Sequence, residues 1–189
     1  SEYDALYVAI GAHADKKLGL PGEDSGNVLS AVEFLRDCGE GRPLDFTGKK
    51  VVVIGGGNVS MDAPRPAIRL EEIADAQAEG CQILPLQAPH RIEAGEDGNV
   101  AALWTKPQII GSYGRDGRPA PRNAAEREFR IPCDYLIIAI GQRIESDNFE
   151  KEGIETSRGA LKADLSGYVP GTPNVFAGGD AVTGPATVI

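Results

Sequence analysis

The chain has 189 residues, 24 of them glycine, and carries a formal net charge of −9 without a block of basic residues. This charge argues against nucleic acid and anionic membranes as partners, and no apolar run approaches the roughly 20 residues that cross a bilayer. The three cysteines, Cys38, Cys81 and Cys133, are isolated and lack C-x-x-C spacing, which excludes a redox dithiol and gives no zinc signature. We expect a cytoplasmic α/β protein whose cysteines are small buried hydrophobic residues.

The N-terminal part of the chain predicts one strand and one helix. Residues 5–11 are nearly all apolar, which predicts a strand buried on both faces, as in a parallel sheet. Residues 13–48 predict a connector with a turn at 20–23 and a helix over 30–38, whose apolar residues fall on one helical face. Gly39 is expected to end that helix.

The most informative segment is residues 51–60, which read Val-Val-Val-Ile-Gly-Gly-Gly-Asn-Val-Ser. A run of β-branched residues followed by glycines predicts a buried parallel strand, a tight turn and a helix N-terminus. Gly55 is expected to supply the turn, and Gly57 lacks a Cβ, so that the backbone can approach a pyrophosphate. Ser60 occupies the third small position of this fingerprint, where glycine or alanine is usual. The segment therefore predicts a dinucleotide site.

The residues after this turn contain a conflict. A helix is expected over 58–70, yet Pro64 and Pro66 fall inside it, and an interior proline costs about 3 kcal/mol. Residues 71–79 look helical again, and residues 81–86 are a candidate edge strand because of the proline that they contain.

The pattern then changes to that of an antiparallel sheet. Residues 90–94 and 100–106 flank an Asp-Gly turn, which predicts a hairpin. A loop rich in glycine, proline and arginine is expected over 111–123, followed by a third strand over 128–131. Three arginines of this loop are expected to be solvated, with a phosphate-binding role as the alternative: Arg115, Arg118 and Arg122.

Two further strands complete the pattern. Residues 135–141 predict a buried strand that ends in Ala-Ile-Gly, as residues 5–11 do, which suggests two nucleotide-binding lobes. Residues 173–180 predict a short strand that runs into Gly-Gly-Asp, a turn in which an aspartate and backbone amides can reach a ribityl or phosphate group. The predicted fold is therefore a Rossmann-like dinucleotide-binding domain with a parallel sheet and an antiparallel β-meander.

The order of these motifs resembles the small subunit of glutamate synthase and the wider group of flavin-dependent NAD(P)H oxidoreductases. The motifs are Ala-Ile-Gly, Leu-Pro-Gly-Glu, Val-Ile-Gly-Gly-Gly-Asn-Val-Ser-Met-Asp, Ile-Ala-Ile-Gly-Gln and Asn-Val-Phe-Ala-Gly-Gly-Asp-Ala-Val-Thr-Gly-Pro-Ala-Thr-Val-Ile. In that group an NAD(P)H domain is inserted into an FAD domain. The resemblance implies three segments: residues 1–48 from the first half of the FAD domain, 49–142 as the NAD(P)H domain, and 143–189 from the second half.

The resemblance also implies the residues of two cofactor sites. Against the NAD(P)H pyrophosphate it places Gly55, Gly57, Asn58 and Val59. Lining the nucleotide cleft it places Gly141 and Gln142, and at the FAD it places Gly179, Asp180 and, near the flavin ring, Thr187. No metal ligand is implied.

The sequence departs from the family pattern in three places. The N-terminal FAD fingerprint and the helix expected after Ile189 are absent, so the chain is expected to be an excised central segment. The family has a further strand and an Arg-rich turn that reads the 2′-phosphate of NADPH, and this stretch is missing between Leu70 and Glu71. The third departure is the proline pair within the expected helix.

The expected function is passage of a hydride from NAD(P)H to FAD, with electrons leaving to a larger partner subunit that holds iron–sulfur centres. The isolated segment is expected to be inactive. The alternatives are a non-catalytic nucleotide-binding or scaffolding module and a flavin-dependent disulfide reductase, which the lack of C-x-x-C disfavours. Hydride transfer needs no catalytic acid, base or nucleophile, so His13 and His90 are expected to be solvated or structural.

Overall fold

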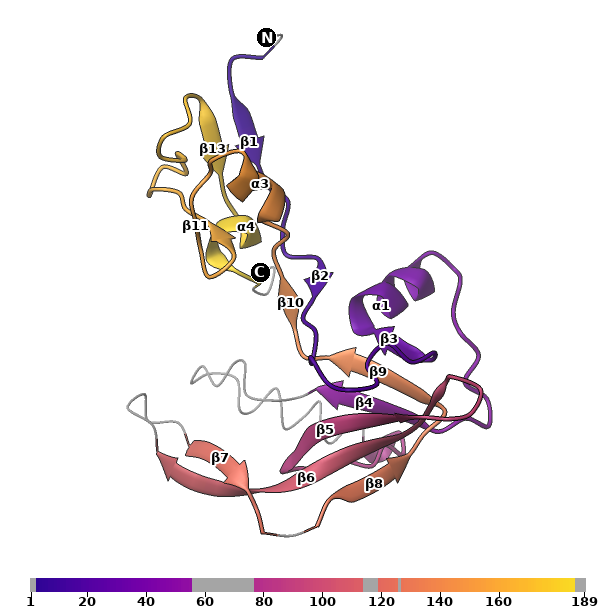
Figure 1. Cartoon of the computed structure of the whole chain (residues 1–189). Helices are drawn as coiled ribbons and strands as arrows, with labels where there is room; N and C mark the ends of the chain where they lie inside the picture. The colour runs from indigo at the N-terminus through magenta and orange to yellow at the C-terminus, as the bar shows by residue number, and fades with distance from the viewer. Residues whose placement is uncertain (1–2, 56–76, 114–118, 126, 186–189) are drawn as a thin grey trace. The chain divides into compact units, whose positions relative to one another are not determined.

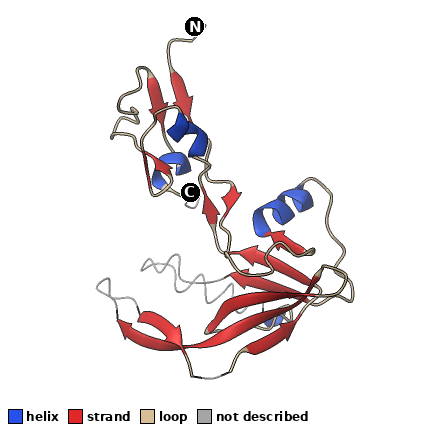
Figure 2. Cartoon of the chain, viewed as in Figure 1, coloured by secondary structure: helices blue, strands red, loops and turns tan. Residues whose placement is uncertain are grey.

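The computed structural model describes most of the chain and shows strands as its main elements (Figures 1 and 2). The described residues are 3–55, 77–113, 119–125 and 127–185. The predicted helix over 58–70, most of the one over 71–79, and the residues Arg115 and Arg118 lie outside this set. Parallel and antiparallel sheets occur together with short helices, so the predicted α/β class is confirmed.

The chain divides into two compact units. Unit 1 consists of Ser1–Lys17, Ser30–Glu40 and Ile140–Ile189, and unit 2 consists of Leu18–Leu29 and Gly41–Ala139. Each unit is therefore assembled from segments that are far apart in the sequence, and each is described by itself below.

Unit 1 contains three pairs of strands and three helices among its described residues. The pairs are parallel β1 (Leu6–Val8) with β13 (Val175–Ala177), antiparallel β2 (Ala14–Asp15) with β10 (Gln142–Arg143), and antiparallel β11 (Thr156–Ser157) with β12 (Ala160–Leu161). The helices are α1 (Ala31–Gly39), α3 (Asp147–Lys151) and α4 (Asp180–Thr183). One cluster of buried residues forms its core: Val8, Ile154, Leu161, Val169, Ala177 and Ala181.

Helix α1 confirms the helix that was predicted over 30–38. Ser30 is its N-cap, and the Ser30 side chain accepts a hydrogen bond from the Glu33 backbone N–H at 3.0 Å. Ser30 and Glu33 have the spacing of a capping box, which favours a helix start at this point. Gly39 is the last helical residue, as the sequence indicated.

Unit 2 contains a three-stranded sheet in the order β3 (Val28–Ser30), β9 (Tyr135–Ala139), β4 (Val51–Gly55). Strands β4 and β9 are parallel and in register from Val51 opposite Tyr135 to Gly55 opposite Ala139. The β-branched runs of both strands are apolar on their inner positions, and the buried residues are Ile54, Leu136, Ile137 and Ile138. Both predicted strands and their parallel pairing are present, and β9 is buried as predicted, but the predicted burial of β4 is wrong in part, since Ile54 is its one buried residue and Val53 is 60% exposed.

Unit 2 also contains the antiparallel meander. Strand β6 (Val100–Tyr113) pairs with β5 (Gln87–Ala94), β7 (Pro119–Asn123) and β8 (Phe129–Pro132). The predicted hairpin is confirmed, and Gly98 in its turn has a φ of 80°, which glycine adopts without steric cost. The loop predicted over 111–123 is wrong in part, because β6 continues to Tyr113 and β7 pairs with it. Proline is compatible with an edge strand such as β7, where its missing N–H is not needed.

The prediction that the first strand is buried on both faces is wrong. In β1, Leu6 is 58% and Tyr7 63% exposed, and only Val8 is buried. The reason is that, among the described residues, only Val8 of this strand belongs to the core cluster of unit 1, so the other two side chains have no layer packed over them.

The predicted edge strand over 81–86 is also wrong. These residues are exposed and unpaired as a strand, and Leu86 has a φ of 56°, which interrupts an extended backbone just before β5 begins at Gln87. Cys81 is consequently exposed, contrary to the expectation for all three cysteines. Cys133 is buried as expected, and Cys38 is intermediate.

Candidate functional site

Gly55 is the described residue of the predicted dinucleotide turn, and it is the last residue of β4. A Cβ at this position would lie 2.7 Å from the Ala139 carbonyl oxygen and 3.0 Å from the Ala139 Cβ. Glycine is thus required because β9 approaches closely, and its φ is not in the left-handed region. Gly57, Asn58, Val59 and Ser60 lie outside the described residues.

Gly141 and Gln142 lie in unit 1 at the start of β10. Gly141 has a φ of 105°, a conformation that favours glycine, and its carbonyl oxygen accepts a hydrogen bond from the Lys16 backbone N–H at 3.1 Å. Gln142 pairs with Asp15 in the β2–β10 ladder. The structure therefore holds this glycine turn against the segment that follows β2.

The Gly-Gly-Asp turn follows β13 in unit 1. Gly178 donates its N–H to the Val8 carbonyl at 3.2 Å, and a Cβ on Gly178 would lie 1.9 Å from the Tyr7 hydroxyl oxygen. Gly179 has φ 63° and ψ −153°, a region that is essentially restricted to glycine. The turn is thus closely packed on the side of Tyr7.

In contrast to Gly178, the backbone of Gly179 is not closely packed. A Cβ there would meet no atom within 4 Å, so the backbone is open to the approach of another molecule. Asp180 begins α4 and is half-buried, and its carboxylate makes no hydrogen bond or ion pair with the described residues. An open glycine backbone beside an available carboxylate suits the hydroxyl groups of a ribityl chain, so these residues fit FAD. Thr187 lies outside the described residues.

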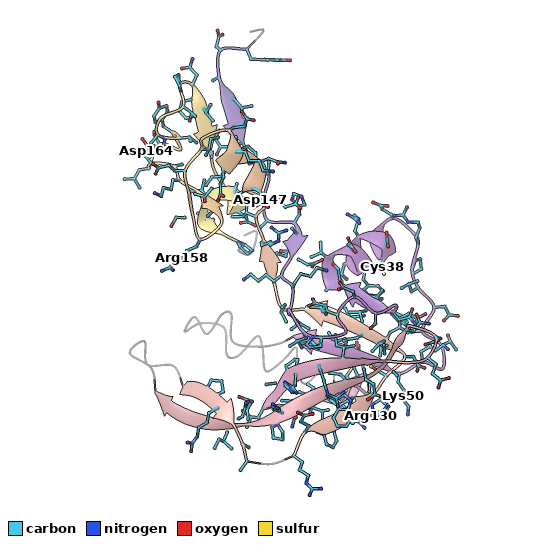
Figure 3. All side chains as sticks on the ribbon, viewed as in Figure 1. Cys38, Lys50, Arg130, Asp147, Arg158 and Asp164 are labelled. Atoms are coloured by element: carbon cyan, nitrogen blue, oxygen red, sulfur yellow. The ribbon has the colours of Figure 1, made fainter. Side chains whose placement is uncertain are left out.

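The titratable side chains of the meander form a surface network in unit 2. Arg130, labelled in Figure 3, donates hydrogen bonds to Glu93 at 2.7 and 3.1 Å. The Trp104 indole N–H donates another at 2.5 Å. These contacts, that with Arg130 foremost, lower the pKa of Glu93 to about 2. The Arg91 guanidinium lies 4.0 Å from the centre of the Trp104 ring. This network ties β5, β6 and β8 together.

The two histidines are both paired with carboxylates. His13 Nε2 lies 3.2 Å from Glu145, and its Nδ1 lies 3.1 Å from the Ile10 carbonyl oxygen. His90 Nε2 lies 3.1 Å from Glu128 in the meander. Burial raises the pKa of the Cys133 thiol, so it is not activated as a nucleophile. Among the described residues, no group of three or more His, Cys, Asp or Glu is placed to hold a metal ion.

Sequence reasoning missed one feature of unit 1. A hollow of about 870 Å³ is lined by Gln142, Arg143 and Ser146 from one segment of the chain and by Lys16 from another, among other residues. Only Gln142 was singled out from the sequence, since no motif marks the others. A signal for Ser146 was its position just before α3, which is typical of a helix cap.

Comparison with known proteins identifies the family. The family model described as pyridine nucleotide-disulphide oxidoreductase matches residues 1–189. The chain belongs to this family, whose cofactors are NAD(P) and FAD, and the resemblance inferred from the motifs is confirmed. No described helix has the length and apolarity needed to cross a membrane.

Relatives with assigned names include subunits of larger enzymes. The NADP(+)-dependent formate dehydrogenase subunit beta of Moorella thermoacetica is 34% identical over 210 residues, covering 100% of this chain and 30% of the relative. The glutamate synthase [NADPH] small chain of Halomonas elongata is 32% identical over 222 residues, covering 100% of this chain and 47% of the relative. The chain thus spans about a third to a half of the length of such relatives.

A solved structure confirms the fold. FprA from Mycobacterium tuberculosis in complex with NADPH superimposes with a TM-score of 0.71 at 21% sequence identity, over 98% of this chain and 60% of FprA. A solved protein therefore has the same α/β fold as this chain.

Proposed function

We propose that this chain binds NAD(P)H and FAD and that a hydride passes from the first to the second. The observation that carries the proposal is the position of the two glycine motifs. Gly55 ends β4, which is parallel to β9, and Gly178 follows β13, which is parallel to β1. Ligands of α/β proteins bind at the carboxyl ends of parallel strands, and both motifs lie at such ends.

The residues proposed for each cofactor are those that the resemblance implied. For the NAD(P)H pyrophosphate they are Gly55, Gly57, Asn58 and Val59, with Gly141 and Gln142 along the nucleotide cleft; for FAD they are Gly179, Asp180 and Thr187. We propose the same segment boundaries, with 1–48 and 143–189 belonging to an FAD domain and 49–142 to an NAD(P)H domain.

The bound cofactors supply the redox chemistry, with the nicotinamide as hydride donor and the flavin as acceptor. The chain's own residues bind and orient them. The close packing of Gly55 on Ala139 holds the end of β4 in place before the turn. The open backbone of Gly179 would leave room for FAD, and the Asp180 carboxylate would accept a hydrogen bond from a hydroxyl group of the cofactor. No proton transfer by a side chain is required.

The electron acceptor is proposed to be a larger partner subunit with iron–sulfur centres. Support comes from relatives that are named as the small chain or beta subunit of an enzyme, such as those of glutamate synthase and formate dehydrogenase. We also propose a cytoplasmic location, since the three cysteines are free, as is usual in a reducing compartment.

FAD titration followed by flavin fluorescence tests the proposal. We expect weak binding by the purified chain, with flavin lost on gel filtration, because only one wall of the site is assigned to it. Asp180→Ala should weaken FAD binding about tenfold, as expected for a lost hydrogen bond to a carboxylate. Asp4→Ala, at an exposed aspartate of the same unit, should leave it unchanged. Equal FAD affinity of Asp180→Ala and the wild type would contradict the assigned site.

The second candidate function is a non-catalytic nucleotide-binding or scaffolding module. This function predicts that NAD(P)H binds while added FAD does not, and the same titration distinguishes the two.

A further inference from the structure

The hollow in unit 1 has the dimensions of a small-molecule site. It measures about 870 Å³ and is lined by residues after β2, in β10, in α3, in the β11–β12 hairpin and at the end of α4. Small-molecule sites are typically about 300 to 1,000 Å³. Ile144 and Leu161, which are 7% and 1% exposed, contribute apolar surface to its wall.

Ser146 is the buried polar residue of this wall. The residue is 3% exposed and stands at the N-cap position of α3, yet its side chain makes no capping hydrogen bond. Its hydroxyl has no hydrogen-bond partner among the described residues. Buried hydroxyl groups are normally hydrogen-bonded. Among the described residues no fully enclosed side-chain oxygen lacks a partner, so the Ser146 oxygen retains access to the hollow and is available to a molecule bound there.

Positive charge predominates among the lining groups that have no partner. Lys16, Arg143 and Arg158 come from three segments, and none of their side chains forms a hydrogen bond or ion pair with the described residues. Arg158 lies at the tip of the β11–β12 hairpin (Figure 3) with a φ of 54°. Such a conformation is strained for a residue other than glycine, asparagine or aspartate.

The acidic lining residues are mostly engaged. Glu150 accepts a hydrogen bond from Thr156, and Asp164 accepts hydrogen bonds from Ser166 and Tyr168. Asp147, on α3, has no such contact among the described residues. The lining lysine not yet mentioned, Lys162, pairs with Glu155. Counted over all lining residues, four cations stand beside three carboxylates, a net charge of +1, and three of the four cations make no ion pair with the described residues.

We propose that this hollow binds a phosphate group carried by a small organic molecule. A phosphate monoester has a charge of about −1.5 to −2 at neutral pH, and it can pair with the cations of the lining that make no ion pair, Lys16, Arg143 and Arg158. Ser146 donates a hydrogen bond to one phosphate oxygen, and the planar guanidinium of Arg143 is suited to two others. The apolar wall at Ile144 and Leu161 contacts the carbon skeleton. The phosphate comes either from a free phosphorylated metabolite or from a cofactor, and the proposal does not depend on the function proposed above.

Calorimetric titration of the purified chain with phenyl phosphate tests the proposal, since this probe combines a phosphate dianion with an apolar ring. We expect saturable binding that is weakened about tenfold in Ser146→Ala and at least as much in Arg143→Gln. Lys151→Gln, which removes a cation of α3 that does not line the hollow, should bind as the wild type does. Circular dichroism and thermal melts show whether each variant is folded, and Ser146→Ala, which loses only one oxygen, carries the test if Arg143→Gln does not fold.

Competition distinguishes the two sources of the phosphate. If NADP+ or FAD displaces phenyl phosphate and its own binding is weakened equally in Ser146→Ala, the phosphate belongs to that cofactor. If phenyl phosphate binds together with both cofactors, a free phosphorylated metabolite is the ligand. Absence of saturable binding, or equal binding by the wild type and Ser146→Ala, would overturn the proposal and leave the NAD(P)H and FAD sites unaffected.

Discussion

Substitution of Gly55 by alanine should destabilise unit 2, because the new methyl group has no room. It would lie 2.7 Å from the Ala139 carbonyl oxygen and 3.0 Å from the Ala139 Cβ, whereas carbon atoms pack best at about 3.5 to 4.0 Å. The atoms that it meets belong to the paired residue of a parallel strand, so β4 and β9 must separate. Overpacking of this kind costs about 1 to 3 kcal/mol. For a chain of this length each kcal/mol lowers the melting temperature by roughly 2 to 4 °C.

Urea unfolding measures this loss directly, with an unchanged m-value showing that only stability has changed. Gly39→Ala is the matched control, since a Cβ on Gly39, the last residue of α1, would meet no atom within 4 Å. That variant should be as stable as the wild type or more stable by up to about 1 kcal/mol, because alanine is the better helix former. If Gly55→Ala unfolds at the same urea concentration as the wild type, the proposed steric contact between β9 and position 55 is wrong. The glycine at this position would then be required only by the turn that follows β4.

Three further predictions concern packing, acid stability and thiol reactivity. Gly178→Ala should lower the melting temperature because its Cβ would lie 1.9 Å from the Tyr7 hydroxyl, and Tyr7→Ala should remove most of that loss in the double variant; additive losses in the melts would contradict the contact. Glu93 has a pKa lowered to about 2 by Arg130 and Trp104, so its ion pair stabilises the fold above its unfolded pKa, near 4.5, and this stabilisation disappears as the pH falls from there through about 2. Glu93→Gln should therefore lose less stability than the wild type in urea unfolding between pH 5 and about 2, and parallel curves would refute this assignment. Cys81 is exposed whereas Cys133 is buried with a raised pKa, so a thiol reagent should label Cys81 rapidly and Cys133 only after unfolding, as mass spectrometry can determine.

Local sequence patterns predicted correctly those strands that find a pairing partner in the folded chain. The apolar runs of β4 and β9 became paired parallel strands, and the Asp-Gly turn of the meander became a hairpin. The segment over 81–86 has a similar apolar run, but a strand requires a pairing partner, and Leu86 adopts a positive φ instead. The prolines of β7 were interpreted as loop signals because edge position cannot be recognised before the sheet is known.

The glycine motifs proposed for the cofactors could be recognised because each is contiguous in the sequence. The reason for the glycine at position 55 was not predictable, because Ala139 is distant along the chain. Only the parallel register brings its carbonyl oxygen to 2.7 Å from the place that a Cβ on Gly55 would occupy. The hollow around Ser146 was missed for the same reason, since its lining residues are widely separated in the sequence, from Lys16 near the N-terminus to Pro185 near the C-terminus. Both features depend on contacts between residues that are far apart in the sequence, and hydrophobic periodicity does not reveal such contacts.

The central claim is that this chain provides a pyridine-nucleotide site at the end of β4, and calorimetric titration with NADPH and NADH tests it most directly. We predict one nucleotide bound per chain, loss of binding in Gly57→Val, and unchanged binding in Gly39→Val, where the added side chain starts in open space. Because the sequence analysis predicts that the Arg-rich turn for the 2′-phosphate is missing, the two nucleotides should bind within about tenfold of each other, a difference below roughly 1.4 kcal/mol. Absence of binding, or equal binding in Gly57→Val and the wild type, would contradict the account.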